Sequence, residues 1–501
     1  MHVVMAAAEA IPFAKTGGLA DVCGTLPLKL AEQGHHCSIF IPGYRRAMTC
    51  GLPMVDTHVT FVVDMADRPM AAHILKTTLG NGAIGNGAVD VYLIDQPLYF
   101  DRDQLYGDER GDFRDNCERF CFFSRCVVEA IERLRLPVDI IHCHDWQAGL
   151  IPAYLKTNFR DFQWYRNAAS VLTIHNLAYQ GRYWQSDMGL TALDWQYFNW
   201  QQMEFFGDLN LLKTGIAFAD FITTVSPSYA MEIQTPAHGC GLDGSLRVRG
   251  NRISGIVNGV DYAVWDPSND NHLVQKYSVD NWQTGKPQCK RDLQRQVGLP
   301  ERDDVPLIGL IGRLAEQKGW DLVLPMLEQS VDALDVQWVI LGNGEQRFAS
   351  PLSELARRRP DRVSVRLEFS DPLAHKIEAA SDMFLMPSRY EPCGLNQLYS
   401  LRYGTVPIVH ATGGLIDTVN NLNEASLATG RATGFSFQPY DYDSLKECVQ
   451  RAVDTYWREP KVWDTLVRTG MAQDWSWTNS ATAYESAYRR ARELAAIEGR
   501  L

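Results

Sequence analysis

The sequence Met-Pro-Ser-Arg-Tyr-Glu-Pro-Cys-Gly-Leu-Asn-Gln-Leu-Tyr occupies residues 386–399 and joins a predicted strand to a predicted helix. The apolar run Met383–Met386 is short enough for a buried strand, and the residues from 397 onward have helical spacing. Two prolines and Gly394 interrupt regular structure, so Glu391 is expected at a strand-to-helix turn, where open α/β sheets bind ligands. A phosphate on the N–H groups of Gly394 and Leu395, with sugar hydroxyls on Glu391, is one interpretation; a plain connection with a surface glutamate is the other.

The composition is that of an ordinary soluble globular protein. The chain has 501 residues, of which 46% are hydrophobic and 22% charged, and this length favours two large domains or three small ones. Its 48 basic and 60 acidic residues give a formal charge of -12. This balance argues against binding to nucleic acid or to an anionic membrane, although a local cationic pocket remains compatible with it.

The cellular compartment follows from the N-terminus and the cysteines. The chain runs from Met1 directly into a strand-like segment without the pattern of a signal peptide, and no apolar run reaches the length of a membrane span. Several of its eleven cysteines lie in apolar segments, as buried thiols do: Cys23, Cys37, Cys121 and Cys126. We therefore expect a cytoplasmic protein with reduced thiols.

Strand-like and helix-like segments alternate along the first half of the chain. A strand over 2–8, a helix over 19–33 and a strand over 37–41 form a βαβ unit, and a long amphipathic helix is expected over 115–134. Glycines 80 and 85 predict a turn among short apolar runs. Further strands are predicted at 59–63, 70–75, 89–94, 138–143, 170–174, 221–225 and 253–257, and a helix at 209–218.

A polar stretch over 258–305, rich in Asn, Asp, Pro and Trp and weakly periodic, marks a domain boundary. The alternation then restarts, with strands predicted at 307–311, 337–341, 363–367 and 407–409 and helices at 321–334, 373–380, 442–457 and 481–496. We predict an N-terminal domain over 1–257, a C-terminal domain over 258–480 and a final helical segment over 481–501 that packs back on the first domain. The expected fold is α/β, with two doubly wound domains facing across a cleft.

A short internal repeat supports two similar halves. Lys-Thr-Gly-Gly-Leu-Ala-Asp at 15–21 resembles Ala-Thr-Gly-Gly-Leu-Ile-Asp at 411–417, and each follows an apolar run. Both place two glycines ahead of a predicted helix with an aspartate in its first turn. Lys15 beside these glycines suits a phosphate, whereas the Gly-x-Gly-x-x-Gly spacing of a dinucleotide site is absent, which disfavours NAD.

The sequence His-Cys-His-Asp-Trp at 142–146 has two histidines on one face of a predicted strand. A closed zinc site needs further ligands at the usual spacing, and the sequence does not supply them, so we expect no metal here. The preferred interpretation is that Asp145 and Trp146 bind a sugar, and that His175 and Asn176 end the next strand in the same way. Core histidines are the alternative.

Arg313 and Lys318 follow another predicted strand and could neutralise a diphosphate, or could be a solvated loop. Five polar residues, Lys15, His175, Arg313, Lys318 and Glu391, are all expected just after the carboxyl ends of strands, and a two-domain cleft would gather them.

Six motifs in this order resemble the bacterial glycogen synthase and plant starch synthase family over nearly the whole chain. They are the segments 15–21, 144–146, 175–181, 258–261, 312–319 and 387–395. The resemblance implies a retaining glycosyltransferase of the GT-B type. It also implies transfer of glucose from ADP-glucose to the non-reducing 4-hydroxyl of an α-1,4-glucan such as glycogen, without a metal or other cofactor.

The resemblance also assigns roles to residues. Lys15 would hold nucleotide phosphate, with Asp21 in the same motif, and Arg313 with Lys318 would neutralise the departing ADP. Asp145, His175 and Asn176 would bind the glucosyl and acceptor side, Glu391 the transferred glucose, and Asn258 the sugar site. Gly18, Cys393, Gly394 and Leu395 would lie against the phosphates, and Tyr106 would reach the base.

Two residues near this turn, Cys393 and Asn396, bear on the expected chemistry. Many bacterial relatives have Thr where this chain has Asn396; a side-chain amide can still donate to phosphate, so the contact is expected to persist. Cys393 is not expected to be a nucleophile, because the family forms no cysteine adduct and a cysteine in this turn is compatible with packing.

The implied mechanism keeps both substrates on one face: an oxygen of the leaving ADP assists deprotonation of the incoming hydroxyl, without a protein nucleophile. Other functions stay open at this point, namely a transferase that uses UDP-glucose, a phosphorylase, or an inactive glucan-binding protein using some of the thirteen tryptophans. No residue distinguishes adenine from uracil, and the sequence does not specify an oligomeric state.

Overall fold

The computed structural model of the chain describes residues 1–66, 68–81, 83–84 and 87–499; of the two turn glycines, Gly85 lies outside them. The chain forms two compact units. The N-terminal unit consists of Met1–Gly259 and Trp477–Leu501, and the C-terminal unit of Val260–Ser476. The boundary therefore falls two residues after the expected 257, and the returning segment begins at Trp477, four residues before the expected 481.

The N-terminal unit is built on a mostly parallel sheet in which β1 is central. The strands from β15 to β6 are parallel, and β4 and β3 extend the sheet in antiparallel fashion beyond β6. The spatial order is β15 (Ile253–Gly255), β14 (Phe221–Thr224), β10 (Ala169–Ile174), β9 (Ile140–His144), β1 (His2–Ala6), β2 (His36–Pro42), β6 (Gly87–Asp95), β4 (Arg68–Leu79) and β3 (Val55–Met65), with β5 (Ala83–Ile84) beside β6.

The direction in which consecutive strands are added reverses at β1. The chain moves from β1 to β2 on one side and later from β9 to β10 on the other, so the space beyond the carboxyl ends of β1 and β9 is a topological switch point. Lys15 and Asp145 lie in the loops that follow these two strands. The sheet topology thus places both motifs where open α/β sheets bind ligands.

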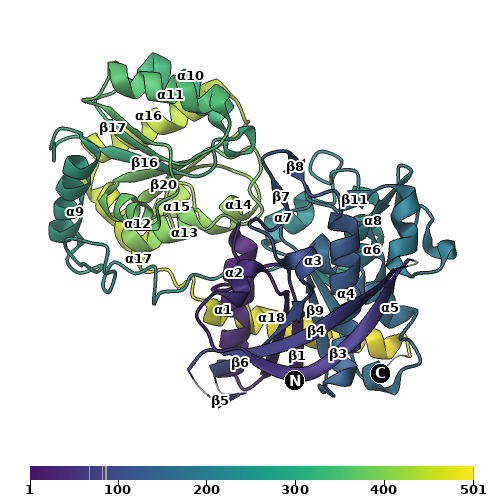
Figure 1. Ribbon diagram of the computed structural model, residues 1–501. Coiled ribbons are helices and arrows are strands. Elements are labelled where there is room, and N and C mark those ends of the chain that lie inside the picture. The colour runs from purple at the N-terminus through teal and green to yellow at the C-terminus, as the bar shows by residue number, and fades with distance from the viewer. Residues whose placement is uncertain (67, 82, 85–86, 500–501) are drawn as a thin grey trace. The chain divides into compact units, whose positions relative to one another are not determined.

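Helices cover this sheet (Figure 1). The long ones are α1 (Gly18–Glu32), α4 (Asn116–Arg133) and α18 (Trp477–Ile497); α18 contacts α1, β10 and β14 and therefore belongs to this unit. The shorter elements are α2 (Arg45–Met48), α3 (Pro97–Phe100), β7 (Gly107–Asp108), β8 (Gly111–Asp112), α5 (Ile151–Lys156), β11 (Arg182–Tyr183), β12 (Glu204–Phe205), β13 (Asp208–Asn210), α6 (Leu211–Phe218), α7 (Pro227–Glu232) and α8 (Asp243–Val248).

The C-terminal unit contains a fully parallel sheet whose order is that of a Rossmann fold. Its strands, in spatial order, are β18 (Val363–Arg366), β17 (Gln337–Leu341), β16 (Leu307–Ile311), β19 (Met383–Met386), β20 (Val406–His410) and β21 (Phe435–Phe437). The switch point lies between β16 and β19. It is followed by the turn that contains Glu391, as the sequence predicted.

The helices of this unit lie on both faces of its sheet, with α10, α11 and α16 on one side and α9, α12 and α13 on the other (Figure 1). Buried parallel strands and helices covering both faces form one continuous apolar core. The helices are α9 (Trp282–Val297), α10 (Trp320–Ser330), α11 (Gln346–Arg358), α12 (Asp371–Ala380), α13 (Asn396–Tyr403), α14 (Gly414–Thr418), α15 (Glu424–Ala428), α16 (Tyr442–Arg458) and α17 (Pro460–Met471).

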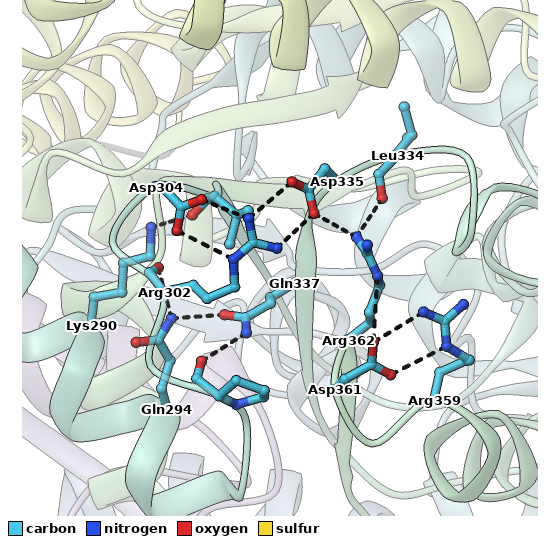
Figure 2. A network of polar contacts seen from close by, with 12 residues as sticks. Lys290, Gln294, Arg302, Asp304, Leu334, Asp335, Gln337, Arg359, Asp361 and Arg362 are labelled. Carbon is cyan, nitrogen blue, oxygen red and sulfur yellow. Dashed lines mark hydrogen bonds and ion pairs between the residues drawn. The ribbon is translucent and has the colours of Figure 1, made fainter.

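Charged side chains gather at the amino ends of β16, β17 and β18, the edge opposite the switch point (Figure 2). Arg302 donates to Asp304 (2.6 Å) and to Asp335 (2.8 Å), and Arg362 donates to the same oxygen of Asp335 (2.9 Å). The hydrogen bond from Arg302 lowers the pKa of Asp335. These pairs are partly exposed, so each adds little stability alone, and they tie together the loops that enter three strands.

Among the described residues, no helix combines the length and the apolar character needed to cross a lipid bilayer.

Candidate active site

The loop after β1 is built around Glu9, a buried carboxylate that sequence reasoning missed. The hydroxyl of Thr16 donates to Oε1 of Glu9 (2.6 Å), and the backbone N–H of Thr16 donates to Oε2. The hydroxyl of Tyr106, predicted to reach the base, also donates to Oε1 of Glu9 (2.7 Å). Glu9 therefore fixes the segment with Lys15 and links it to Tyr106. Its only signal in the sequence is an acidic residue directly after an apolar strand.

Lys15 is held by Asp21 across the start of α1. Its Nζ lies 2.7 Å from Oδ1 of Asp21, and the Lys15 side chain is 49% exposed. An ion pair this exposed contributes at most about 1 kcal/mol, so Lys15 can exchange the carboxylate for a phosphate at little cost. The helix begins at Gly18, the second glycine of the motif, and α14 begins at the equivalent Gly414. In both copies of the internal repeat a helix therefore begins at the second glycine, although Gly413 has a positive φ (47°) and Gly17 is extended.

Asp145 adopts a strained conformation at the end of β9. Its φ of 56° is unusual for a residue with a side chain, and such strain is typical of functional sites. Its Oδ1 accepts a hydrogen bond from the backbone N–H of His175 (2.7 Å), which joins the ends of β9 and β10. Burial raises the pKa of Asp145 to about 7. The carboxyl group can therefore accept or donate a hydrogen bond near neutral pH.

Two buried histidines, His142 and His144, and the partly buried His175 form a row beside Asp145. Nε2 of His175 lies 3.0 Å from Nδ1 of His144, and His142 lies 2.6 Å from the hydroxyl of Thr173. Burial lowers the pKa of both His142 and His175 to about 3 and that of His144 well below its usual value. The imidazole of His175 is neutral at physiological pH, so it can hydrogen-bond a sugar hydroxyl but does not act as a cation.

Three further residues of the N-terminal unit, Gly181, Asn176 and Asn258, belong to the sequence motifs or follow them directly. A side chain at Gly181 would approach the ring of Trp146 to 2.4 Å, so the glycine permits close packing of the tryptophan from the 144–146 motif. Asn176 accepts a hydrogen bond from the backbone of Ala178 (3.0 Å). Asn258 is 5% exposed, and its Oδ1 has no hydrogen-bond partner among the described residues. A buried acceptor left unpaired costs about 1–3 kcal/mol, which a ligand hydroxyl would recover.

The C-terminal unit has a pocket of about 180 Å³ at its switch point. Residues at the carboxyl ends of β16 and β19 and at the start of α13 surround it. The lining residues are Leu310, Ile311, Gly312, Lys318, Trp320, Leu385, Met386, Pro387, Ser388, Glu391, Gly394, Leu395 and Asn396. The pocket thus collects five of the residues predicted from the sequence.

Glu391 and Lys318 form an ion pair in the pocket wall. Nζ of Lys318 lies 2.6 Å from Oε2 of Glu391, whose side chain is 8% exposed, and the hydroxyl of Ser388 donates to the same oxygen (2.8 Å). Within the described residues no contact to Oε1 of Glu391 is found, so this oxygen can accept a hydrogen bond from a sugar hydroxyl. Ser388 was not singled out from the sequence, although it precedes Glu391 by three residues in the same turn.

Arg313 follows β16 but does not line the pocket. Its side chain is exposed and its Nη2 lies 3.1 Å from Oε1 of Gln317, while its carbonyl oxygen accepts from the indole of Trp320 (3.1 Å). Trp320 lines the pocket and was also missed, because its position in the first turn of α10 reads as ordinary helix packing.

The start of α13 offers backbone N–H groups to the pocket. Leu395, the residue before the helix, has an apolar side chain that cannot cap these groups. Gly394 has a φ of +73°, and a β-carbon there would lie 2.4 Å from Oε1 of Gln397. The Nδ2 of Asn396 donates to the carbonyl of Ile311 (3.1 Å), which uses one of its two hydrogens. Cys393 is buried and its carbonyl packs against Gly414.

Comparisons with known proteins identify the family of the chain. Residues 2–248 match the family profile of the starch synthase catalytic domain, and residues 291–463 match that of glycosyl transferases group 1. The chain is 46% identical to a glycogen synthase of Rhodopirellula baltica over 99% of this chain and 98% of that one. It is 44% identical to a glycogen synthase of Koribacter versatilis, over 99% of both chains.

Solved structures show the same relationship. The catalytic domain of starch synthase IV from Arabidopsis thaliana, bound to ADP and acarbose, superposes with a TM-score of 0.88 at 31% identity and covers 98% of this chain and 99% of that one. A sucrose-phosphate synthase from Thermosynechococcus elongatus, 18% identical with a TM-score of 0.57, shares the fold. The prediction of two Rossmann-like domains of the GT-B type is confirmed. The chain belongs to the glycogen synthase and starch synthase family of glycosyltransferases.

Proposed function

We propose that this glycosyltransferase transfers glucose from ADP-glucose to the non-reducing 4-hydroxyl of an α-1,4-glucan, with retention of configuration. The observation that carries the proposal is the pocket in the C-terminal unit, where the Lys318–Glu391 pair lies beside the start of α13 at the switch point of a Rossmann fold. The related starch synthase IV was solved with ADP and acarbose, which supports adenosine as the nucleoside.

The donor interactions are assigned to the C-terminal unit. The N–H groups at Gly394, Leu395 and Asn396 bind a phosphate, because the start of a helix carries a partial positive charge. Glu391 binds hydroxyls of the transferred glucose. Lys318 and Arg313 neutralise the negative charge that develops on the departing ADP, and each cation contributes about 4 kcal/mol of gross attraction at 4 Å before desolvation.

The acceptor interactions are assigned to the N-terminal unit. Asp145, His175 and Asn176 contact sugar hydroxyls through neutral or near-neutral groups, and Asn258 offers its unpaired carbonyl oxygen. Lys15 and Gly18 contribute to phosphate binding once Asp21 releases Lys15. Tyr106, held by Glu9, is assigned to contact the base.

The reaction proceeds on one face of the sugar. As the bond between the anomeric carbon and the phosphate oxygen breaks, the departing phosphate oxygen accepts the proton of the incoming 4-hydroxyl, and the new glycosidic bond forms on the same face. Protein cations stabilise the leaving group, so neither a metal ion nor a cysteine adduct is required. A covalent glucosyl intermediate trapped on Glu391 would contradict this mechanism.

The decisive test compares two donors. Labelled ADP-glucose and UDP-glucose are each incubated with the enzyme and glycogen, with and without EDTA, and incorporation into polymer is measured. We expect incorporation from ADP-glucose, unaffected by EDTA, and release of the label as maltose by β-amylase, which shows terminal α-1,4 linkages. Preference for UDP-glucose would overturn the donor assignment. Glycogen binding without incorporation would identify a glucan-binding protein instead.

A further inference from the structure

A cluster of potential metal ligands lies in the C-terminal unit and shares no residue with the pocket. It consists of His375 and Asp371 on α12 and His272 in the loop that precedes α9. One ligand atom from each side chain lies within 4.8 Å of the other two. Asp371 and His375 are four positions apart on a helix, which places both side chains on one face. His272 approaches that face from a distant part of the chain.

His375 is the buried member of the cluster, and one of its ring nitrogens has no hydrogen-bond partner among the described residues. Its side chain is 1% exposed and stacks on the ring of Trp265 at 3.7 Å. Nδ1 lies 2.8 Å from Oδ2 of Asp270. Nε2 is buried without a hydrogen-bond partner among the described residues, and Oδ2 of Asp371, at 3.8 Å, is too far for a hydrogen bond. When Nδ1 donates to Asp270, Nε2 carries the lone pair that a metal requires.

Asp270 contacts both histidines, through the ring of His375 and the backbone of His272. In addition to the contact with His375, its Oδ1 accepts the backbone N–H of His272 (2.8 Å), and the hydroxyl of Tyr403 donates to Oδ2 (2.6 Å). A carboxylate behind a ligand histidine is the usual support of a metal site, because it fixes the ring and its tautomer.

We propose that His272, Asp371 and His375 bind a zinc ion, with Asp270 supporting the site from behind. Two imidazoles and one carboxylate suit zinc better than magnesium or calcium, which prefer oxygen ligands alone. Ligand atoms around tetrahedral zinc are about 3.4 Å apart, so the cluster must contract. His272 and Asp371 are exposed and can move toward the fixed His375. Their exposure leaves the fourth position to water.

The site joins two segments of one unit. His272 belongs to the loop that follows the domain boundary, whereas Asp371 and His375 belong to α12, which packs against α9. A bound ion would link this loop to the helix layer, and because ions that bind only the folded state stabilise it, the unit would unfold at a higher temperature. The zinc site is independent of the proposed reaction, since turnover needs none of its residues.

The test uses the full-length chain with Cys240→Ser, because Cys240 is an exposed thiol that would compete for zinc. After removal of metal by EDTA and dialysis, zinc is titrated against an indicator dye of known affinity. We expect one equivalent to bind, with affinity reduced at least tenfold in His272→Ala and in Asp371→Asn. The matched control is His58→Ala, whose side chain is 89% exposed and lies 3.4 Å from Asp56; it should bind zinc as the parent does.

Cobalt provides a second measurement that does not depend on activity. Co²⁺ in a tetrahedral site absorbs strongly in the visible range, and we expect this absorption in the parent and the His58→Ala protein but not in His272→Ala. Zinc should also raise the Tm of the parent and not that of Asp371→Asn. The substitutions are at exposed positions, which avoids disturbing the stacked His375. Unchanged zinc affinity in both His272→Ala and Asp371→Asn, or no binding by the parent, would overturn the proposal.

Discussion

Glu391 is a nearly buried carboxylate that accepts hydrogen bonds from Lys318 and from Ser388 at the same oxygen. A buried charge is costly unless it is paired, and here the pair lies at the wall of the pocket. Lys318 thus has two tasks: it stabilises Glu391 before substrate binds, and it is proposed to stabilise the leaving phosphate afterwards. The two tasks can be separated by measurement.

Lys318→Ala should lower kcat by about 10²–10³-fold, the usual effect of losing one group that stabilises charge in a transition state. Lys318→Arg should retain part of the activity because it keeps the charge. Lys461→Ala, at an exposed position on α17, is the control and should be as active as the parent. Far-UV circular dichroism should show that each variant is folded. Near-normal turnover of a folded Lys318→Ala enzyme would remove the proposed role.

Two histidines with lowered pKa values, His142 and His175, make stability depend on pH. Burial lowers the pKa of His142 and His175 to about 3, whereas unfolded histidines titrate near 6.5. Their stabilising contribution is therefore present above pH 6.5 and is lost as pH falls toward 3, because the unfolded chain takes up protons that the folded one does not. Each contributes a slope of at most about 1.4 kcal/mol per pH unit.

We therefore expect the free energy of unfolding to decrease between pH 7 and pH 5, and His175→Asn to make this dependence shallower. Urea unfolding at several pH values measures the slope. His58→Asn reports what an exposed histidine contributes, since its side chain is 89% exposed. An unchanged slope in His175→Asn would show that His175 becomes protonated in the folded protein.

At the scale of single elements, buried strands were the most predictable. β16 and β17 begin and end at the residues predicted, because parallel strands covered on both faces are continuous apolar runs. Helix α10 was expected over 321–334 but ends at Ser330. Helix α9 was missed within the polar stretch 258–305, because it contains Pro287 and buries only one narrow face. A local sequence pattern does not predict a helix, or the end of one, that is determined by packing against distant segments.

The candidate site was also predictable only in part. Motif residues such as Glu391 and Lys318 were identified because both follow a strand end, and the structure joins them in one wall. Contacts between distant segments were not predictable: Glu9 holds Tyr106 from 97 positions away, and Asp270 holds His375 from 105. No periodicity or spacing specifies such a pair, because it depends on the packing of several intervening elements.

The turn before α13 should be sensitive to a single methyl group. Gly394→Ala would force a β-carbon to within 2.4 Å of Gln397 at a φ of +73°, so we expect a loss of about 1–3 kcal/mol of stability and weaker phosphate binding. Gly430→Ala is the control, because Gly430 also has a positive φ (+63°) but faces open space. The Tm of both variants and the KM for the donor measure the effect. Equal behaviour of the two variants would contradict a special role of the turn.

At the scale of the whole molecule, the two units differ in how the chain builds them. The C-terminal unit is one continuous segment, Val260–Ser476, whereas the N-terminal unit needs the distant α18 to complete it. Tyr488 on α18 places its hydroxyl 2.9 Å from Nδ1 of His142, and the helix buries residues at three- and four-residue spacing against α1 and β10. Without α18, this part of the sheet would be open to water.

We expect residues 260–476 alone to unfold cooperatively, and residues 1–259 alone to lack a cooperative transition. Joining residue 259 to residue 477 through a short linker should restore folding, since these residues are neighbours: a β-carbon at Gly259 would lie 2.5 Å from Cα of Trp477. Thermal melts followed by circular dichroism test all three chains. A fragment 1–259 as stable as the joined chain would show that α18 is dispensable.

The position of α18 at the end of the sequence also affects how the N-terminal unit folds during translation. The ribosome synthesises the chain from its amino end. After Gly259 has been made, more than two hundred further residues are synthesised before α18 is available to complete the N-terminal unit. The second unit can mature first, although it is translated later. Throughout that interval the apolar surface that α18 covers is exposed to water. We therefore expect a nascent-chain chaperone to bind this surface and to dissociate only after Trp477–Ile497 has left the exit tunnel.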